Sequence, residues 1–543
     1  MKNKNSMPYN TEYVSNLKEL VNLTAEKYGD NPAITFERNN DIVSVSYRQF
    51  KSDINALGTE FYSMGVKNEK IAVIGENSYE WMLTYLAAVN SGNVIVPLDK
   101  ELTLAEISNL LSDCGAQVLV YSDDYSKAAD YLQKNGADIR LYINMKSFAE
   151  MLYRGATLIS RGENYAVDYE VDNHALAALL YTSGTTGSAK GVMLSHFGIA
   201  RNATVACEYV EVTGNNMLVL PLHHSFGFAG GLCALLFKGS EICINSSLKN
   251  ILTDLQKFKP HNMLLVPLFV EKFQKRIWDS AKKQKKDGLL RRLTGLSNTL
   301  LKAGIDTRKL MFKSVRRAFG GNLKLIVSGG APLDAKYIQG LRDFGINVMN
   351  GYGITECSPV VSVSRSKNSR DGSIGHVLSC CEVKILEPNE DGHGEICVKG
   401  DNVMLGYYNN EQATKEAFDG QWFKTGDIGY LDKDGFLYIT GRKKNLIILS
   451  NGKNVYPEEI EFDLLNNIPY ILEAVVYAEN NRIAAEVFLD TENEPDCASR
   501  LDGDILRFNQ TQASYRNIKR ILIRETEFPK TTTKKIKRQY KKQ

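Results

Sequence analysis

The stretch that decides the fold is Tyr181-Thr-Ser-Gly-Thr-Thr-Gly-Ser-Ala-Lys-Gly-Val192, which follows the apolar run 175–180. An apolar run of this length is typical of a buried strand. The glycines that follow, Gly184, Gly187 and Gly191, let the backbone approach a ligand closely, and consecutive N–H groups in such a loop form an anion site. Further donors are the polar groups of Ser183, Thr185, Thr186 and Lys190. The stretch therefore predicts a loop that binds a polyphosphate.

The loop lacks the features of two familiar phosphate-binding motifs. A Walker A loop ends in Gly-Lys-Ser/Thr and closes on a helix, whereas Ser188 and Ala189 separate Gly187 from Lys190 here. The GxGxxG pattern of dinucleotide-binding proteins is absent from this stretch as well. A Gly/Ser/Thr-rich surface turn is the alternative interpretation.

Length and composition limit the class of protein. A chain of 543 residues exceeds one ordinary core, so at least two domains are expected. The 66 basic and 63 acidic residues give a net charge of +3, which does not favour nucleic-acid binding. Segment 1–12 has lysines without an apolar core behind them, so no signal peptide is expected. The most apolar window, 218–237, contains Pro221, His223 and His224, which argues against a membrane span.

The nine cysteines have neither metal-binding spacing nor a disulfide pattern. They fit the reduced thiols of a cytoplasmic protein. Cys380 and Cys381 are adjacent, so redox sensing by this pair is an alternative to simple buried packing.

The order of helical and strand patterns predicts an α/β fold. Within 15–170, and again within 202–266, strands alternate with helices, which indicates parallel or mixed sheets wrapped by helices. From Gly394 onward strands follow one another, so the large N-terminal domain, 1–441, is expected to include a β-barrel-like part. Residues 445–543 are expected to form a small, mobile α+β domain.

Segment 271–317 combines many cations with leucines at helical spacing. Its cations include Lys275, Arg276, Lys282, Lys283, Lys285, Lys286, Arg291, Arg292, Arg316 and Arg317. An amphipathic basic helical segment of this kind is attracted to an anionic membrane surface or an acidic partner. A solvated helical face is the alternative interpretation.

Two glycine-rich turns follow two predicted strands. Strand 323–327 ends at turn 328–333, and strand 347–349 ends at segment 350–356. Ligands collect beyond the carboxyl ends of parallel strands, so we expect both turns to meet the polyphosphate loop in one crevice. Tyr352 can lie flat against a planar base, and the carboxylate of Glu356 suits Mg²⁺, with a helix cap as its alternative role.

Two later segments carry further candidate ligand-binding groups. Asp427 follows a glycine in the stretch 422–427, before a predicted hairpin turn at 432–435. A carboxylate there can bind ribose hydroxyls, although Asp at a turn is often only an Asx-turn former. The tail 528–538 is rich in cations, which indicates either a functional loop or a solvated charge run.

Taken in order, six motifs resemble those of the adenylate-forming superfamily, which comprises acyl-CoA synthetases, peptide-synthetase adenylation domains and luciferases. The motifs are residues 181–192, 328–333, 352–356, 425–427, 441–444 and 529–536. The basic insertion before Ser328 and the string 447–461 most resemble long-chain fatty acid–CoA ligases. Such an enzyme joins a carboxylic acid to the α-phosphate of ATP, releases pyrophosphate, and passes the acyl group to the thiol of coenzyme A.

The resemblance implies a role for each matching residue. Residues 183–190 would bind the β- and γ-phosphates, and Thr355 and Glu356 would contact the α-phosphate and Mg²⁺. Lys535 would bridge carboxylate and phosphate oxygens. The implied nucleotide-binding set is Thr182, Ser183, Gly184, Thr185, Thr186, Gly187, Lys190, Gly330, Ala331, Asn350, Gly351, Tyr352, Asp427 and Arg442. Within this set, adenine would lie among Gly330, Ala331, Asn350 and Tyr352, and the ribose on Asp427 and Arg442.

The resemblance also implies that the small domain swings about a hinge at Lys444, which exchanges Lys535 for a CoA tunnel between the two half-reactions. Three residues depart from the family pattern. Lys444 stands where Asp is common, Ala189 stands where proline is frequent, and Lys534 replaces the usual glycine. The active cation is therefore Lys535 or its neighbour Lys534.

The acid-binding residues favour a medium-to-long-chain fatty acid. Peptide-synthetase domains place an Asp near the position of Phe226, whereas stretch 222–228 has no carboxylate, so the ammonium of an amino acid would remain unpaired. The resemblance places Phe226, Gly329 and Gly353 at the acyl pocket, and the missing side chain at Gly353 is expected to leave room for the acyl chain. His224 is expected to contact the substrate carboxylate, or to be a core histidine.

These expectations leave two alternatives for function. The acyl group could pass to the phosphopantetheine arm of an acyl carrier protein instead of CoA, or the chain could be an ATP-binding module without turnover. The expected small molecules are a fatty acid, ATP, Mg²⁺ and coenzyme A. The expected location is cytoplasmic, with peripheral membrane contact through 271–317.

Overall fold

The computed structural model describes residues 13–182, 189–365, 368–449, 453–479, 482–530 and 536–538. The chain forms two compact units. The first comprises the described residues of 1–382 and 398–421, and the second comprises those of 383–397 and 422–543. The predicted α/β class is confirmed in the sheets and helices of both units.

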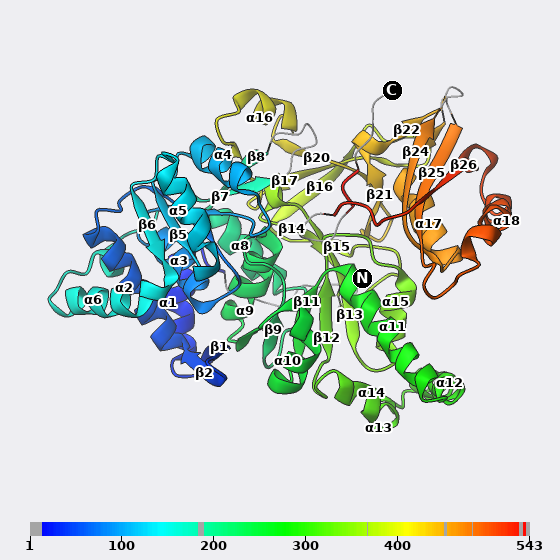
Figure 1. The fold of residues 1–543 in the computed structure, drawn as a ribbon, viewed down its shortest axis with the longest axis horizontal. Coiled ribbons are helices and arrows are strands. Elements are labelled where there is room, and N and C mark those ends of the chain that lie inside the picture. Colours follow the sequence, from blue (N-terminus) through cyan, green and yellow to red (C-terminus); the bar gives the residue numbers. More distant parts are fainter. Residues whose placement is uncertain are drawn as a thin grey trace. The chain divides into compact units, whose positions relative to one another are not determined.

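A seven-stranded sheet of the first unit, in the order β18-β8-β7-β4-β3-β5-β6, contains the strand that precedes the polyphosphate loop (Figure 1). Its strands are β3 (Lys70–Ile74), β4 (Val94–Pro97), β5 (Val118–Tyr121), β6 (Leu141–Asn144), β7 (Leu176–Thr182), β8 (Lys190–Ser195) and β18 (Gly406–Tyr407). Strands β7, β4, β3, β5 and β6 are parallel, whereas β8 and β18 add antiparallel pairs. The apolar side chains of Ile74, Val96 and Leu119 are buried here, as in a sheet covered by helices.

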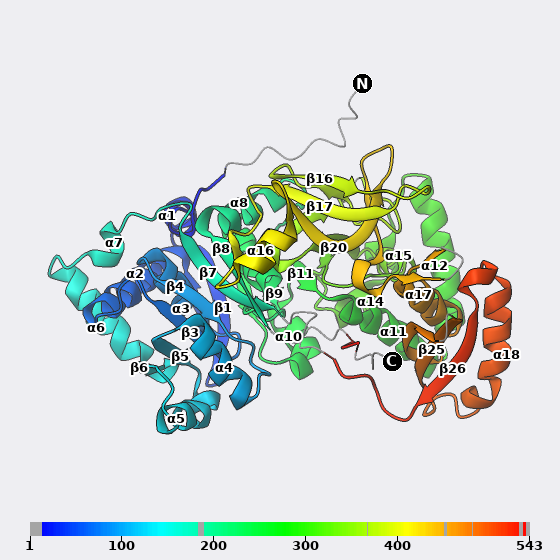
Figure 2. The same ribbon diagram turned by 90° about the horizontal axis from the view of Figure 1, so that it is seen from above.

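Helices connect the parallel strands, as the alternating pattern predicted. They are α3 (Tyr79–Asn90), α4 (Leu104–Cys114), α5 (Ser126–Lys134), α6 (Phe148–Ser160) and α7 (Tyr165–Asp168), and a further helix, α2 (Tyr47–Ser63), precedes β3. Helix α4 begins with a capping box, in which the Thr103 hydroxyl accepts the N–H of Glu106 and the Glu106 carboxylate accepts the N–H of Thr103. Helix α2 lies beside both α3 and α6 (Figure 2).

A nine-stranded sheet, in the order β15-β14-β13-β12-β11-β9-β10-β1-β2, forms the other layer of strands in the first unit. Its strands are β1 (Pro32–Arg38), β2 (Asp41–Ser46), β9 (Asn216–Leu218), β10 (Ile242–Ile244), β11 (Asn262–Leu265), β12 (Leu325–Ser328), β13 (Asn347–Gly353), β14 (Val360–Val363) and β15 (His376–Val377). The central strands from β1 to β13 are parallel, and β2, β14 and β15 are antiparallel at the two edges.

Helices pack on this sheet through one apolar core. They are α10 (Ile251–Phe258), α11 (Pro267–Lys283) and α15 (Ala335–Arg342), and their buried side chains Leu255, Phe273 and Ile338 share a cluster with Ile326 and Val348 of the sheet. The remaining helices of the first unit outside 271–317 are α1 (Leu17–Tyr28), α8 (His196–Ala206), α9 (Ala234–Phe237) and α16 (Glu411–Ala417).

The basic segment 271–317 is helical, as predicted. After α11 it contains α12 (Asp287–Lys302), α13 (Arg308–Met311) and α14 (Lys313–Ala318). Pro267 opens α11 directly after β11, at a position where the missing N–H would have no partner within the helix. Across the described ranges, no helix has both the length and the apolar character that a membrane crossing requires.

The β-barrel-like part takes the form of an open sheet. It has the order β16-β17-β20-β19, with β21 paired to β20, and in the described part of the chain it does not close into a barrel. Its strands are β16 (Cys381–Leu386), β17 (Gly394–Gly400), β19 (Phe418–Asp419), β20 (Trp422–Leu431) and β21 (Leu437–Arg442). The predicted hairpin turn at 432–435 is confirmed, because one carboxylate oxygen of Asp432 accepts the N–H groups of Asp434 and Phe436.

The predicted α+β fold of the C-terminal region is confirmed within the second unit. A three-stranded sheet, β24 (Ile471–Glu479), β25 (Arg482–Leu489) and β26 (Ile518–Arg524), packs with α17 (Pro457–Asn467) and α18 (Cys497–Gln510). A short hairpin, β22 (Ile447–Ile448) with β23 (Asn454–Val455), contributes Val455 to the same core. Pro457 occupies the first turn of α17, as expected.

Candidate functional site

The two glycine-rich turns meet at the carboxyl ends of three parallel strands. The last residues of β11 and β12 are in register with Asn350 of β13, with Leu265 opposite Ser328 and Ser328 opposite Asn350. A Cβ atom on Gly329 would lie 3.3 Å from the carbonyl oxygen of Gly351, so the turn after β12 lies directly against β13. The two turns are therefore neighbours in the fold, whereas residues 183–188 of the loop predicted to meet them lie outside the described residues.

The turn after β12 has two features of a ligand site. Gly330 has φ +88°, a conformation that side chains rarely adopt. The Oγ atom of Ser328 is buried and makes no hydrogen bond among the described residues, and a buried hydroxyl normally has a partner. Ala331 lies in the same turn, and Asn350, Gly351 and the buried Tyr352 line the end of β13.

The polyphosphate loop connects β7 and β8, which are antiparallel neighbours. Thr182 ends β7 and pairs with Lys190, the first residue of β8, so a strand follows the loop where a Walker A motif has a helix. The buried strand predicted before the loop is confirmed. Five predicted phosphate-binding residues lie outside the described residues, namely Ser183, Gly184, Thr185, Thr186 and Gly187.

Glu356, Tyr407 and Lys190 form a connected cluster. Glu356 lies in a 3₁₀ turn, 355–357, and its Oε1 atom accepts a 3.0 Å hydrogen bond from the hydroxyl of Tyr407. The Nζ atom of Lys190 lies 4.8 Å from the centre of the Tyr407 ring, which is cation–π distance. Burial and the Glu356 carboxylate raise the pKa of Tyr407, so its hydroxyl remains protonated and donates.

Tyr407 was not among the residues predicted from the sequence. It lies in β18, whose pairing with β8 places Tyr407 opposite Val192. No local motif marks this tyrosine, since its partners Glu356 and Lys190 are far away in the sequence. The pairing of β18 with β8 brings Tyr407 near Lys190, and the packing of turn 355–357 against these strands adds Glu356.

His224 lies in the turn between β9 and the helix that begins at Phe226. The neighbouring Ser225 places its Oγ atom 3.4 Å from Oγ1 of Thr355, so this turn borders the segment that carries Glu356. The rings of His223 and His224 are 4.3 Å apart between centroids. Burial, followed by the nearby His224 and Lys100, lowers the pKa of His223 well below its usual range.

Phe226 begins a π-helix, Phe226–Cys233, a rare geometry that is frequent at functional sites. Its ring packs with Leu264 and Val266 at the end of β11, and a Cβ atom on Gly329 would lie 3.3 Å from this ring. Phe226 and Gly329 therefore lie side by side, as their predicted shared pocket requires.

The structure gives a further reason for glycine at position 353. A Cβ atom there would lie 2.2 Å from the carbonyl oxygen of Pro359 and 3.0 Å from Cα of Val360. The missing side chain therefore accommodates a close backbone approach, and the room expected for an acyl chain stays a prediction.

The replacement Gly353→Ala is expected to lower the free energy of unfolding by about 2–3 kcal/mol, because the added methyl group must displace the backbone at Pro359. Urea denaturation measures this change. Gly351→Ala on the same strand is the matched control, because its Cβ would meet no atom closer than 3.6 Å. Equal stability of the two variants would contradict the close contact at Gly353.

Asp427 and Arg442 are opposite each other in the second unit, on β20 and β21. Nε of Arg442 lies 2.7 Å from Oδ1 of Asp427, and the Asp427 side chain is buried. The Thr425 hydroxyl accepts the N–H of Asp427 and donates to the carbonyl of Ile396, which holds the turn before the carboxylate. The two predicted ribose-binding residues thus form one ion pair.

The hinge and tail residues also lie in the second unit. Lys444 is in the 3₁₀ turn 443–445, and burial together with Arg442 and Arg538 lowers its pKa. Lys535 and its neighbour Lys534 lie outside the described residues. Lys530 and Ile536 form an antiparallel bridge on either side of that segment.

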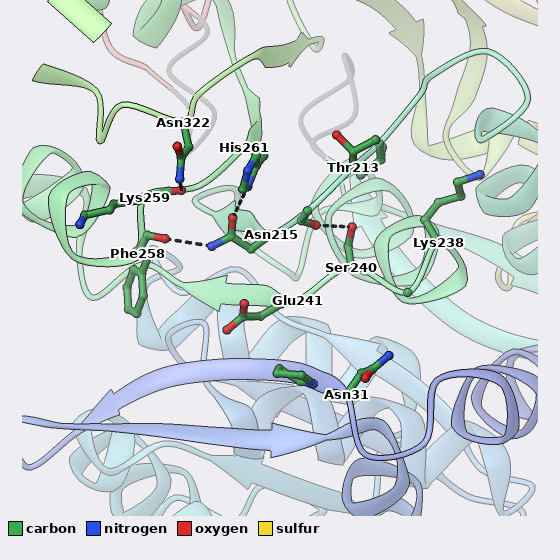
Figure 3. A pocket seen from close by; sticks show the side chains of 14 residues that line it. Asn31, Thr213, Asn215, Lys238, Ser240, Glu241, Phe258, Lys259, His261 and Asn322 are labelled. Carbon is green, nitrogen blue, oxygen red and sulfur yellow. Dashed lines mark hydrogen bonds between the residues drawn. The ribbon is translucent and has the colours of Figure 1, made fainter. Parts of the chain in front are cut away.

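A cavity of about 630 Å³ contains none of the predicted residues (Figure 3). It lies where β9, β10, β11 and β12 begin, at the opposite ends of these strands from the turns described above. Its polar groups are partnered: Asn215 bonds His261 at 2.7 Å and the carbonyl of Phe258 at 2.9 Å, and Ser240 donates to the carbonyl of Gly214. Ligands of parallel sheets bind beyond the carboxyl ends of the strands, so the turns after β12 and β13 are the candidate site.

Comparison with known proteins identifies the family. A family model described as AMP-binding enzyme matches residues 21–408. The chain is 29% identical to a long-chain-fatty-acid–CoA ligase, FadD15 of Mycobacterium bovis, over 91% of this chain and 90% of that protein. It is 30% identical to fatty acyl-CoA synthetase A of Dictyostelium discoideum, over 80% of this chain and 70% of that protein.

The fold is also similar to that of solved structures. The O-succinylbenzoate coenzyme A synthetase of Bacillus subtilis, in complex with ATP and magnesium ion, aligns with a TM-score of 0.72 and 23% identity, over 95% of this chain and 98% of that one. The similar fold and the family match over most of the chain agree with the six ordered motifs. The chain therefore belongs to the AMP-binding enzyme family, within the adenylate-forming superfamily that its motifs resemble.

Proposed function

We propose that this enzyme activates a medium-to-long-chain fatty acid with ATP and then transfers the acyl group to coenzyme A. The acid displaces pyrophosphate from ATP to give an acyl-adenylate, and the CoA thiol displaces AMP to give the thioester. The observation that carries the proposal is the meeting of the turns after β12 and β13 with Thr355 and Glu356 beside them. The two relatives named for fatty acyl substrates support the choice of acid.

Nucleotide binding is assigned to the groups at the strand ends. The turn 329–331 and residues 350–352 would surround adenine, and the unpartnered Oγ of Ser328 offers a hydrogen bond at the same edge. Thr182 and Lys190 flank the loop that would hold the β- and γ-phosphates, together with Ser183, Gly184, Thr185, Thr186 and Gly187. Successive N–H groups and one lysine suit the negative charge of a polyphosphate.

Glu356 fits the Mg²⁺ that accompanies ATP. The ion prefers hard oxygen ligands and is usually held by one or two carboxylates plus phosphate oxygens and waters. Tyr407 holds one oxygen of the half-buried Glu356 carboxylate, which orients the group. When bound, Mg²⁺ supplies positive charge against the phosphates.

The acid would lie between the His224 turn and the Phe226 ring. Phe226 packs in an apolar cluster with Leu264 and Val266, and stretch 222–228 has no carboxylate to pair with an ammonium group. These features favour an uncharged acyl chain over an amino acid. His224 would contact the substrate carboxylate through an N–H donor.

The second unit would supply the ribose-binding and mobile parts. We assign the ribose hydroxyls to Asp427 and Arg442, whose ion pair would open to admit them. Residues 445–543 would move as a domain about Lys444, following an N-terminal domain of residues 1–441. Lys535 would neutralise charge between the carboxylate and the α-phosphate during adenylation and leave when CoA enters.

The proposal is tested by ATP–pyrophosphate exchange with acetate, octanoate, palmitate and phenylalanine. Exchange with octanoate and palmitate is expected. Exchange driven by phenylalanine alone would overturn the proposed substrate class, and no exchange with any acid while ATP still binds would favour an ATP-binding module. Thioester formation with free CoA, compared with phosphopantetheinylated acyl carrier protein, identifies the acceptor.

We further propose that α12 and α13 contact an anionic membrane surface. The large apolar side chains exposed here are Leu289, Leu296, Leu301, Ile305 and Leu310, the last with 81% of its surface accessible. Exposed cations, among them Lys285, Arg292 and Lys309, lie between them. Apolar side chains flanked by cations match the interface of an anionic bilayer.

The protein is accordingly expected to sediment with phosphatidylcholine vesicles that contain phosphatidylglycerol, and to be released by high salt. The double replacement Leu289→Gln with Leu296→Gln should reduce sedimentation, and the exposed Thr299→Gln on the same helix is the control. Absence of sedimentation with anionic vesicles would refute this contact.

A further inference from the structure

We propose that Asp99, His223 and His224 form a binding site for one late first-row divalent metal ion, with Zn²⁺ and Co²⁺ as the best-matched ions. Asp99 follows β4 of the seven-stranded sheet, and the two histidines follow β9 of the nine-stranded sheet. The site therefore joins two segments of the first unit that are distant in sequence. It is separate from the Mg²⁺ assignment at Glu356.

One distance between the candidate ligand atoms already matches that in a tetrahedrally coordinated metal site. Nε2 of His223 lies 3.4 Å from Oδ1 of Asp99, and one ligand atom from each of the three residues lies within 4.8 Å of the others. A tetrahedral Zn²⁺ with bonds of about 2.0–2.2 Å separates its ligand atoms by about 3.3–3.6 Å. One edge of the tetrahedron is therefore already present. Small rotations of the half-buried Asp99 and His224 side chains can bring in the third ligand atom.

His223 supplies an independent reason to expect a ligand. Its side chain is only 4% exposed, and its Nε2 atom makes no hydrogen bond with the described residues. Buried side-chain nitrogens normally have a partner, and a metal ion between His223 and Asp99 would provide one. The carboxylate would also offset the charge of the ion.

The donor set favours a transition metal over Mg²⁺. Two imidazoles with one carboxylate bind Zn²⁺ in sites that keep a fourth position open, whereas Mg²⁺ prefers oxygen ligands. The open position would hold water or another oxygen ligand.

The position of the site implies that a bound metal ion regulates acid activation. This regulatory effect rests on the proposed function. His224 is assigned to the substrate carboxylate, and the adjacent Ser225 lies 3.4 Å from Thr355. An ion that binds the His224 ring would withdraw it from the acid. Zn²⁺ is therefore expected to inhibit acid-dependent ATP–pyrophosphate exchange.

Titration of the full-length protein with Co²⁺, without substrates, tests the site directly. Wild type is expected to develop the visible absorption of tetrahedral Co²⁺ and to saturate at one ion per chain. Asp99→Asn and His223→Gln should lose this absorption, whereas His174→Gln, at an exposed histidine outside the cluster, should retain it. Circular dichroism and thermal melting without metal establish that each variant is folded.

Three results would overturn the site: no tetrahedral absorption in wild type, absorption that persists in folded Asp99→Asn and His223→Gln, or a thiolate-to-cobalt charge-transfer band that assigns the ion to cysteine. The inhibition is judged separately. Co²⁺ binding without an effect of Zn²⁺ on exchange would support the site and refute its regulatory effect. If the protein shows no exchange activity at all, the proposed function fails, while the Co²⁺ spectrum still decides the site.

Discussion

Replacement of Lys535 by alanine is expected to lower the rate of acyl-adenylate formation by about 100- to 1,000-fold while ATP still binds. Negative charge gathers on the α-phosphate oxygens in the transition state, and the loss of one well-placed donor to such an oxyanion typically has an effect of this size. The lysine is assigned to the mobile domain, so the nucleotide contacts at the strand ends would remain. ATP–pyrophosphate exchange measures the rate, and isothermal titration calorimetry measures ATP affinity.

Lys534→Ala is the matched control, because it removes the same charge one position away. It is expected to change exchange only slightly. The reverse pattern, with a large loss in Lys534→Ala and a small loss in Lys535→Ala, would identify Lys534 as the active cation. Unchanged exchange in both variants would show that neither lysine acts in the adenylation step. The thioester-forming step, measured from preformed acyl-adenylate, should retain most of its rate in Lys535→Ala.

The second large effect is expected for Glu356→Gln, with an exchange rate about 100-fold or more below that of wild type at a fixed low Mg²⁺ concentration. The amide keeps the size of the side chain but lacks the negative charge that Mg²⁺ favours. Higher Mg²⁺ concentrations should restore part of the rate. A variant whose Mg²⁺ dependence is unchanged, but whose melting temperature is lower, would indicate that Glu356 acts only as a structural cap.

Variants of Tyr407 are expected to lose less activity than Glu356→Gln, because Tyr407 only orients the Glu356 carboxylate. Tyr407→Phe removes the 3.0 Å hydrogen bond to Glu356 but keeps the ring near Lys190, so a rate loss of about 10-fold and a higher Mg²⁺ concentration for the half-maximal rate are expected. Tyr407→Leu also removes the aromatic face and should raise the apparent KM for ATP further. Two variants with the same Mg²⁺ and ATP dependence as wild type would show that Tyr407 does not position this cluster.

Many elements could be predicted because their signals are local. Buried parallel strands such as β7 and β12 are short apolar runs next to glycine, and the turn at 432–435 follows from Asp and Gly at fixed positions. The helices of 271–317 follow from leucine spacing. The open form of the five-stranded sheet could not be predicted, because closure depends on how strands pair at the edges.

The residues of the candidate site also differ in whether a local sequence motif marks them. Glu356, Asn350 and Asp427 stand in short motifs, so they could be selected from the sequence, whereas Tyr407 stands in no motif and was missed. Gly353 was selected for the acyl pocket, but the close backbone approach at this position was not predicted. Its neighbour in space is the carbonyl of Pro359, across a turn whose geometry the sequence pattern does not show.

The sequence by itself determined the family and the alternation of strands and helices, and it supplied the residues proposed to bind the nucleotide, because each is encoded in neighbouring residues. Only the tertiary structure decided which distant side chains touch. It joined Tyr407 to Glu356 and Asp99 to His223, and it placed a cavity of about 630 Å³ at the strand ends opposite the site. The physical reason is that such contacts depend on sheet register and packing between segments far apart in the chain, which local patterns do not specify.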